Sequence, residues 1–365
     1  MFGLLTDVLS IWEDSEPFYR IANNGGKVWF MPVRNMRTAM NLYQPSGHNG
    51  KLLKALFPLL HWLPFPWRKL NIERTRCSLS DDLYRRLCEL FGVGRLEFAV
   101  FCGTPSVHQK LTVQLILGNK ILGYCKISDN QEVGEMFARE SEILTHLHNC
   151  GIRTIPIPLY AGEWHRCTYL FVQSTCKTHQ SRVVHEWGTL HEAFLNNLYA
   201  TTRQELQFEQ TDYYITLTKL CQHLGWLLSE DMRATVKNAI DKVIKNNSGK
   251  KVEYCAYHAD FTPWNMFVES GKLFVFDWEY ACLTYPPMLD RYHFFTQTAI
   301  FERDWTVKEI MDFMLTPDAG WIKKETYILY LLDVIARFTI REKGNVTGDI
   351  ARSMEIWNEL LKNLQ

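Results

Sequence analysis

The chain has no excess of charge of either sign, because 40 lysines and arginines balance 40 aspartates and glutamates. No strong overall field therefore points to nucleic acid as a partner, and a charged ligand would have to be recognised locally. The ten cysteines are dispersed, and no two of them form a C-x-x-C pair. This spacing argues against a zinc site or a disulfide framework and indicates the reduced thiols of a cytoplasmic protein.

No hydrophobic run is long enough to cross a bilayer. The apolar stretch Leu52–Leu63 is shorter than the roughly 20 residues of a spanning helix, and it contains Pro58. The chain also has no basic N-terminal region followed by a small-residue cleavage site, which argues against secretion. Internal repeats and low-complexity tracts are absent as well. We therefore expect a cytoplasmic protein.

The apolar stretch leaves two hypotheses open. Basic residues lie near both of its ends, and aromatic residues lie at and after its C-terminal end: Lys51, Lys54, Trp62, Phe65, Trp67, Arg68 and Lys69. Side chains of these two kinds favour a lipid headgroup boundary, so residues 52–67 could bring the protein to the inner face of the membrane by peripheral contact. Most amphipathic helices instead pack on the core of their own protein, and we favour this alternative.

What the chain does have is enough apolar material for two lobes, since 47% of its 365 residues are hydrophobic. Its most informative stretch, Tyr257–Tyr280, has the sequence YHADFTPWNMFVESGKLFVFDWEY. Two short apolar runs separated by Glu-Ser-Gly-Lys predict a β-hairpin. The open end of this hairpin gathers four polar residues: His258, Asp260, Asn265 and Asp277.

These residue types suit phosphoryl transfer. A carboxylate is needed to orient and deprotonate an acceptor hydroxyl, and magnesium prefers oxygen ligands. Asp260 suits the role of the base, and Asn265 and Asp277 suit the metal. The order H-x-D-x-x-x-x-N followed by a later Asp is that of the catalytic and metal-binding segments in protein-kinase-like proteins. A buried hairpin with turn-forming Asp and Asn residues is the alternative that the pattern alone leaves open.

The stretch resembles the aminoglycoside phosphotransferase and choline kinase-like family, whose pattern is H-G-D-x-x-x-x-N followed by an apolar-Asp-Trp/Phe-Glu strand. Ala259 stands where that family usually has Gly, and we expect this change between small residues to be tolerated. The resemblance covers about residues 95–300. It implies a two-lobed α+β protein-kinase-like fold, with an N-terminal antiparallel sheet and one helix, and a mainly helical C-terminal lobe.

On this basis we divide the chain into three parts. Residues 1–79 form an N-terminal extension with the apolar helix, residues 80–174 the nucleotide-binding lobe, and residues 175–365 the helical C-terminal lobe with the catalytic loop. Strand-like runs in the second part predict an antiparallel meander: 95–102, 111–117 and 121–127.

Lys126 on the third of these strands and Glu140 on the following helix would form the ion pair that positions nucleotide phosphates in kinases. We choose Glu140 over Glu142 because leucines follow Glu140 four and seven residues later, as in the resembled family. A solvated edge-strand lysine is the alternative for Lys126. Gly103 and Ser106, in the turn after the first strand, would lie over the phosphates, unless this turn is a plain hairpin loop.

Gln173 and Ser174 fall where the resembled family has its interlobe hinge, so backbone groups near them would hydrogen-bond the adenine edge. The resemblance thus implies a kinase that uses ATP and Mg²⁺. His258 would support the catalytic loop by hydrogen bonds and packing rather than transfer a proton. Asp290 would mainly cap the next helix and anchor its segment.

The resembled family phosphorylates small hydroxyl compounds: aminoglycosides, choline, ethanolamine, sugars and homoserine. An aminoglycoside typically calls for an acidic pocket, and the C-terminal part has no dense acidic cluster beyond EWGTLHE and SEDM. The W-F-x-P-V and Y-x-P-S segments near the N-terminus resemble an extension on members that accompany bacterial surface-polysaccharide synthesis. We therefore favour a sugar or surface-glycan precursor as the acceptor over an aminoglycoside, choline or ethanolamine.

A kinase-like nucleotide-binding module without turnover is the alternative of another class. The complete set of Asp260, Asn265 and Asp277 argues against it, because a decayed site usually loses one of these residues. A protein kinase is disfavoured because no activation segment follows Asp277.

Overall fold

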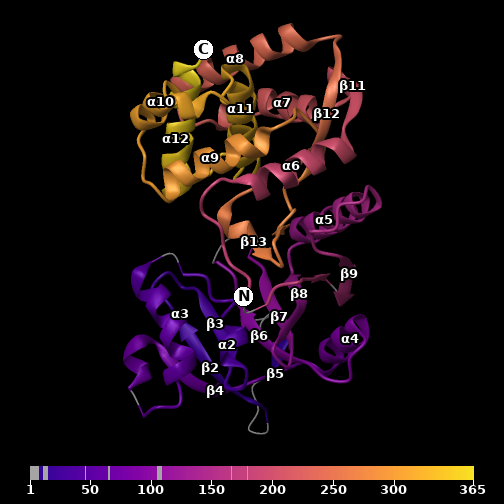
Figure 1. The fold of residues 1–365 in the computed structure, drawn as a ribbon, viewed down its shortest axis with the longest axis vertical. Coiled ribbons are helices and arrows are strands. Elements are labelled where there is room, and N and C mark those ends of the chain that lie inside the picture. Colours follow the sequence, from indigo (N-terminus) through magenta and orange to yellow (C-terminus); the bar gives the residue numbers. More distant parts are fainter. Residues whose placement is uncertain are drawn as a thin grey trace. The chain divides into compact units, whose positions relative to one another are not determined.

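The computed structural model describes residues 8–10, 15–45, 47–64, 66–104, 109–165, 167–178 and 180–365. The chain divides into two compact units, which Figure 1 colours along the sequence. The first unit consists of Met1–His148, Thr154–Arg182 and Val268–Phe274. The second consists of Asn149–Arg153, Val183–Phe267 and Val275–Gln365. Each unit is therefore assembled from segments that are separated in the sequence.

The first unit is built on an eight-stranded antiparallel sheet with the strand order β4-β2-β3-β6-β7-β8-β10-β9. Its strands are β2 (Pro17–Ala22), β3 (Val28–Pro32), β4 (Ile72–Arg76), β6 (Glu97–Phe101), β7 (Leu111–Leu117), β8 (Lys120–Ser128), β9 (Pro158–His165) and β10 (Thr168–Ser174). The predicted meander is confirmed as β6, β7 and β8. Because β2, β3 and β4 precede residue 79, one sheet joins the predicted extension to the predicted nucleotide-binding lobe.

Hydrophobic side chains cover both faces of this sheet near β2. Phe18 and Tyr19 belong to different hydrophobic clusters, because successive side chains of a strand point to opposite faces. Helix α4 (Asp81–Phe91) packs in the cluster of Phe18. Helices α2 (Met36–Ala39) and α3 (His48–Leu60) pack in the cluster of Tyr19. Both faces of the sheet are thus closed by helices.

The predicted apolar helix is α3. One face of it packs on its own protein, as we favoured, because the Phe57 side chain has no exposed surface and its ring lies 5.2 Å from that of Tyr19. Phe65 lies outside the described residues. None of the helices in the described part of the chain is long and apolar enough to span a membrane. The first unit also contains η1 (Trp67–Leu70), α5 (Gln131–Asn149) up to His148, and a small sheet of β1 (Leu9–Ser10) and β5 (Ser78–Leu79).

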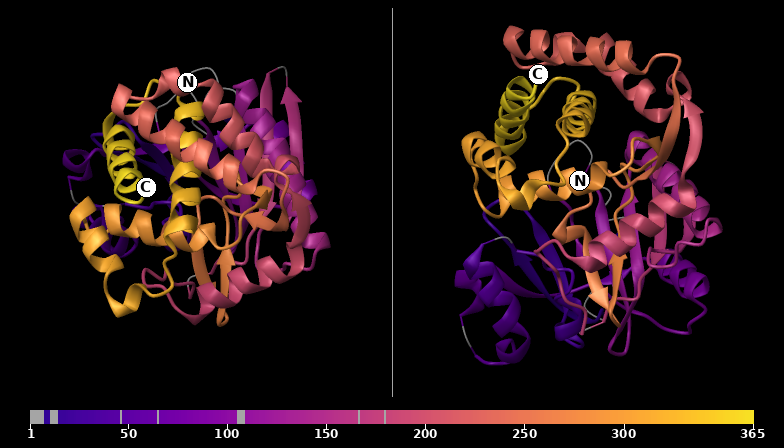
Figure 2. Two further views of the ribbon diagram at one scale, coloured as in Figure 1. Left: turned by 90° about the horizontal axis from the view of Figure 1, so that it is seen from above. Right: turned by 45° about the horizontal axis from the view of Figure 1, so that its top comes forward.

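The second unit is mainly helical. Its helices are α6 (Thr189–Thr202), α7 (Asp212–Gln222), α8 (Glu230–Asn247), α9 (Leu289–Phe301), α10 (Val307–Met314), α11 (Lys324–Arg341) and α12 (Gly348–Asn363), with the short η2 (Phe208–Gln210), η3 (Leu224–Trp226), η4 (Pro263–Asn265) and η5 (Pro317–Ala319). Figure 2 shows α11 and α12 side by side, and α11 also contacts α7, α8 and α9. Helix α11 is therefore the centre of the core of this unit.

A second, smaller sheet and the predicted hairpin complete the fold. Strands β11 (Gln204–Gln207), β12 (Lys251–Tyr257) and β15 (Cys282–Tyr285) form a three-stranded sheet. The hairpin is confirmed as β13 (Met266–Glu269) and β14 (Lys272–Val275). Its turn places Ser270 at φ 50° and Gly271 at φ 76°. Positive φ at both central residues is typical of a tight hairpin turn, which explains the glycine.

Candidate active site

The candidate residues fall into two groups, one in each unit. The first unit contains Gly103, Lys126, Glu140, Gln173 and Ser174, and the second contains His258, Asp260, Asn265 and Asp277. Ser106 lies outside the described residues.

The His258 ring connects the loop after β12 to the end of β14. Its Nδ1 accepts a hydrogen bond from the Asp260 amide at 3.1 Å, and its Nε2 lies 3.0 Å from the carbonyl oxygen of Phe276. Because a backbone amide only donates, Nδ1 is the unprotonated nitrogen and Nε2 donates to Phe276. Burial lowers the pKa of His258 to about 4, against the opposing effect of the carboxylates of Asp260 and Asp277. A neutral ring fits the predicted supporting role.

The carboxylate of Asp260 is held by two side chains. Asn265 Nδ2 donates to Oδ2 at 2.6 Å, and His293 Nε2 lies 3.1 Å from Oδ1. Burial raises the pKa of Asp260, but the hydrogen bond from His293 and the nearby imidazoles outweigh this effect, so the pKa lies below its usual value. Asp260 is therefore ionised at neutral pH and fixed in one orientation, as a proton acceptor must be.

Asn265 and Asp277 offer oxygen atoms that suit a magnesium ion. A carboxylate only accepts, so Nδ2 is the Asn265 atom that faces Asp260, and Oδ1 is the atom that can ligate a cation. Asp277 adds a half-buried carboxylate directly after Phe276, whose amide donates to the Asn265 carbonyl at 3.0 Å. Mg²⁺ takes one or two such ligands and completes its shell with water and phosphates. The donor set of this loop therefore fits the ion.

Two residues of the loop region have a left-handed backbone: Ala259 with φ 71° and Asp277 with φ 67°. This conformation costs a residue other than glycine about 1–2 kcal/mol, which explains the glycine of the family pattern. Burial of the Ala259 methyl group in the core offsets about 0.8 kcal/mol of this cost. Such strain persists only where the surroundings fix the backbone, and it is concentrated at functional sites.

Asp290 and Arg337 fix the strained backbone. Asp290, in the first turn of α9, accepts hydrogen bonds from the amides of His258 at 2.9 Å and Ala259 at 3.1 Å. Arg337 on α11 donates to the Ala259 carbonyl and to Asp333 Oδ2, the latter at 2.6 Å. The predicted cap at Asp290 is wrong, because Met288 occupies the N-cap position and the Asp290 oxygens serve the loop. Its predicted anchoring role is confirmed.

His293 and Arg337 also belong to the site, although neither is predicted from the sequence. His293 follows Asp290 by three residues on α9, so both side chains share one helix face, and this spacing is the signal that could have indicated it. Its side chain is buried, and within the described residues its Nδ1 has no hydrogen-bond partner. Arg337 is far from the loop in the sequence and belongs to a helix of ordinary periodicity, so no local pattern indicates its contact with Ala259.

In the first unit, Lys126 and Glu140 form the expected ion pair. Lys126 Nζ lies 2.9 Å and 3.2 Å from the two carboxylate oxygens of Glu140. The alternative of a solvated edge-strand lysine is wrong, because β8 lies between β7 and β10 and Lys126 is only 7% exposed. Glu142, in contrast, points to solvent. The role of the pair in binding nucleotide phosphates stays a prediction.

The glycine of the predicted phosphate loop has a structural reason of its own. Gly103 has φ 77°, and an added Cβ would lie 2.3 Å from the carbonyl oxygen of Lys110. Only glycine therefore lets the chain close at this point. At the predicted hinge, the Ser174 amide donates to the Ile157 carbonyl at 2.9 Å. Adenine recognition near Gln173 and Ser174 stays a prediction, and it would use neighbouring backbone groups rather than this amide.

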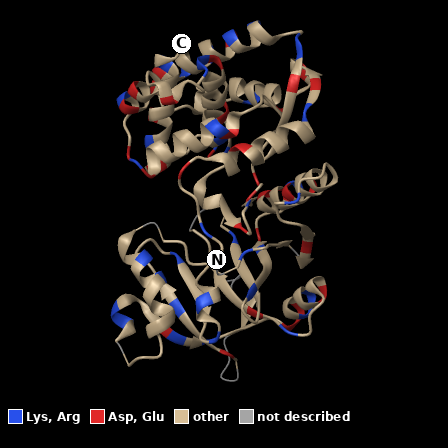
Figure 3. Ribbon diagram, viewed as in Figure 1, with Lys and Arg blue, Asp and Glu red and all other residues tan. Residues whose placement is uncertain are grey.

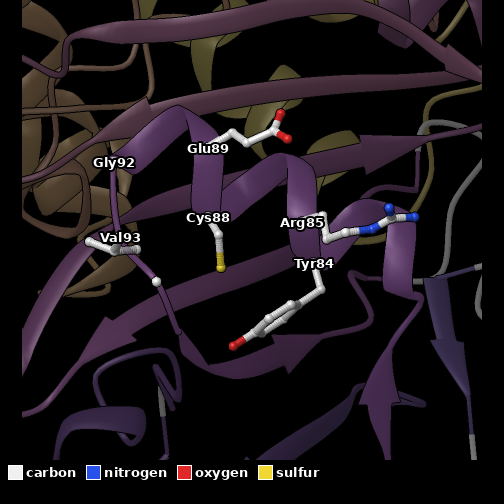
Figure 4. A pocket seen from close by; sticks show the side chains of 7 residues that line it. Tyr84, Arg85, Cys88, Glu89, Gly92 and Val93 are labelled. Carbon is white, nitrogen blue, oxygen red and sulfur yellow. The ribbon is translucent and has the colours of Figure 1, made fainter.

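A hollow of about 330 Å³ lies on the surface of the first unit beside α4 (Figure 4) and contains none of the candidate residues. Tyr84 and Cys88 point to the same side of the helix there, as residues four apart must. The Tyr84 hydroxyl already accepts from the Leu96 amide at 2.9 Å, and Arg85 Nε donates to the Asp81 carbonyl at 3.3 Å. We assign no ligand to this hollow.

No model of a protein family and no curated protein matches the chain. Two solved structures of a thermostable mutant of aminoglycoside phosphotransferase APH(4)-Ia, in ternary complexes with AMP-PNP and hygromycin B, each have a TM-score of 0.50. They are 13% and 14% identical, and the alignments cover 77% and 78% of this chain and 98% of each of those chains. The choline kinase LicA from Streptococcus pneumoniae has a TM-score of 0.42 at 14% identity, over 69% of this chain and 89% of that one.

At these identities the similarity to the aminoglycoside phosphotransferase concerns the fold alone. The predicted α+β architecture, with an antiparallel sheet in one part and a helical second part, is confirmed. The chain therefore has the protein-kinase-like fold of the aminoglycoside phosphotransferases.

Proposed function

We propose that the chain is an ATP-dependent phosphotransferase that moves the γ-phosphoryl group to a hydroxyl of a small molecule. The observation that carries this proposal is the geometry of Asp260. Its carboxylate is ionised, and Asn265 and His293 hold it from both sides. A carboxylate held in this way is suited to orient a hydroxyl and accept its proton.

The oxygen of the acceptor hydroxyl would attack the γ-phosphorus, and Asp260 would accept the proton of this hydroxyl. The bond between the γ-phosphorus and the oxygen that bridges it to the β-phosphate would break at the same time, and ADP would leave. Lys126, held by Glu140, would neutralise the α- and β-phosphates. Asn265 and Asp277 would hold Mg²⁺, which supplies positive charge to the phosphate oxygens when bound. Neutral His258 would keep the loop in place through its two hydrogen bonds.

We infer that the acceptor is a sugar or surface-glycan precursor. An aminoglycoside carries several positive charges and needs acidic groups to bind it. The acidic residues of the EWGTLHE segment already have basic partners: Glu186 lies 3.1 Å from Arg303, and Glu192 lies 3.7 Å from Arg291. These pairs neutralise the acidic charge of the segment and support a neutral or anionic acceptor.

The test is an ATP-consumption screen of the full chain with magnesium and a panel of hydroxyl acceptors. The panel contains monosaccharides, sugar phosphates, lipid-linked saccharides, kanamycin, hygromycin B, choline and ethanolamine. Asp260→Asn is the blank, and loss of the proton acceptor should lower turnover by about 10²–10⁴. Asp312→Asn, which changes an exposed carboxylate on α10, is the matched control and should keep full activity.

Turnover with a saccharide that disappears in Asp260→Asn supports the proposal. Turnover with kanamycin, hygromycin B, choline or ethanolamine alone would show that the acceptor class is wrong. Unchanged turnover in Asp260→Asn would show that the assigned base is wrong. Nucleotide binding without turnover for any acceptor would favour the non-catalytic module.

A further inference from the structure

Helix α3 has two apolar stripes, and among the described residues only one of them packs on the protein. Leu53 and Phe57 face the sheet and belong to its hydrophobic cluster. The second stripe has the same helical spacing, with steps of four and three residues. Its members are exposed by 51%, 42% and 64%, in the order Leu52, Leu56 and Leu59, and Leu63, which is 37% exposed, lies beyond the end of the helix at Leu60.

The exposed apolar surface continues past the end of the helix. Trp62 is 69% exposed, and Leu70, at the end of η1, is 49% exposed. Single exposed apolar residues need no explanation, but a contiguous group of large ones marks a surface that contacts another partner. The buried anchor Phe57 holds the helix so that this group faces outward.

The charge of the surrounding sequence has one sign. The stretch from Pro17 to Ile72 contains no aspartate and no glutamate, in a chain whose formal net charge is zero. Its basic residues are Arg20, Lys27, Arg34, Arg37, Lys51, Lys54, Arg68 and Lys69. Figure 3 shows these basic segments in blue on α3 and on the strands next to it. Arg20 is paired with Glu73 of β4 at 3.8 Å, and the basic residues that remain in excess make an anionic partner complementary to this surface.

A pocket of about 540 Å³ opens where the exposed stripe ends. The residues that line it include Trp62, Trp67, Arg68 and Arg74. Arg74 Nε donates to the Tyr19 hydroxyl at 3.1 Å, which fixes this arginine in place. Guanidinium groups beside an aromatic wall suit a phosphate that carries an apolar neighbour.

We propose that α3, η1 and this pocket dock on a bilayer that contains anionic phospholipids. Leucine and tryptophan side chains would enter the boundary between headgroups and acyl chains, while arginine and lysine would contact the lipid phosphates. A second copy of the chain fits less well, because a symmetric contact through this surface would place basic residues against basic residues. The proposal does not depend on the proposed phosphotransferase activity.

The test is co-sedimentation of the full chain with vesicles of phosphatidylglycerol and phosphatidylcholine, compared with phosphatidylcholine alone. We expect binding to the anionic vesicles and its loss at high ionic strength. Leu56→Gln/Leu59→Gln/Trp62→Gln removes the apolar part of the surface and should abolish binding. Each basic residue near an anionic surface contributes a similar amount to the binding free energy. The loss of two such contributions in Arg68→Gln/Arg74→Gln should therefore weaken binding by roughly thirty-fold.

Two matched controls change other parts of the surface. Leu315→Gln replaces a leucine that is 86% exposed in the second unit, and Lys242→Gln/Lys245→Gln removes two exposed lysines of α8. Both should bind vesicles like the parent chain, and circular dichroism checks that every variant is folded. Absence of binding to anionic vesicles, or equal losses in the control variants, would overturn the proposal. The proposal would also be overturned if the parent chain were a dimer, the variant Leu56→Gln/Leu59→Gln/Trp62→Gln were a monomer, and neither protein bound lipid.

Discussion

His258 should make the stability of the second unit depend on pH. Its side chain is completely buried, and burial lowers its pKa from the usual 6.5 to about 4. Between these two values the unfolded chain binds a proton that the folded chain does not bind, so a falling pH favours unfolding. The stabilising contribution is thus fully present above pH 6.5 and is lost as the pH falls towards 4. The shift corresponds to about 3 kcal/mol of unfolding free energy.

Two variants isolate this effect. His258→Asn can still accept from the Asp260 amide, and His258→Gln can still donate to the Phe276 carbonyl, but neither side chain titrates. We would measure urea unfolding at several pH values by the fluorescence of tryptophan, since the Trp278 ring lies 4.5 Å from that of His258. Other buried groups titrate in the same range, so the quantity to compare is the difference in unfolding free energy between parent and variant.

At pH 7 both variants should be less stable than the parent chain, because each loses one of two buried hydrogen bonds. By pH 4 the unfolding free energy of the parent chain should have fallen by about 3 kcal/mol relative to that of the variants, so the variants should be as stable as the parent chain or more stable. His185→Gln, which changes a surface histidine of the same unit, should show the slope of the parent chain. A difference between parent and His258 variants that stays the same at both pH values would refute the reasoning.

Three further predictions concern single contacts. Lys126→Met leaves the Glu140 carboxylate buried without its ammonium and should destabilise the chain by about 3–5 kcal/mol in urea unfolding. His293→Gln removes the imidazole beside Asp260, so the pKa of that carboxylate should rise and the acidic limb of the pH–rate profile should move to higher pH, with a lower kcat. Gly123→Ala would place a Cβ 2.1 Å from a backbone carbonyl of β10, and we expect a loss of at least about 2 kcal/mol in thermal unfolding.

Each of these predictions has a control. The double variant Lys126→Met/Glu140→Met should be more stable than Lys126→Met alone, and a double variant of equal or lower stability would contradict the ion-pair argument. Gly94→Ala should leave stability nearly unchanged, since nothing lies within 4 Å of its added Cβ. For His293, a lower kcat without any displacement of the pH profile would indicate a purely structural role.

The hairpin and the meander could be predicted because their signals are local. Two short apolar runs and a glycine at a turn with positive φ specify β13, β14 and the Ser270-Gly271 turn within a few residues of sequence. The Lys126–Glu140 pair could be predicted because one helix directly follows one strand. In both cases the partners are close in the chain.

The membership of β2 and β4 in the large sheet is not predicted from the sequence. β4 has exposed or half-exposed polar residues along most of its length, and its burial at Ile72 depends on pairing with β2, far away in the sequence. The contact between Arg337 and Ala259 is non-local in the same way. A single sequence contains no local signal for contacts between segments that are far apart in the chain.

The hairpin between β13 and β14 has a consequence for synthesis. Residues Val268–Phe274 belong to the first unit, although most of that unit ends at Arg182. There, Val268 bridges to Arg182, and the Glu269 carboxylate accepts from the Thr178 hydroxyl at 2.9 Å. Domains usually fold from the N-terminus as the chain leaves the ribosome. The first unit must wait for about 92 more residues, at roughly 5–20 residues per second, before its last segment has been made.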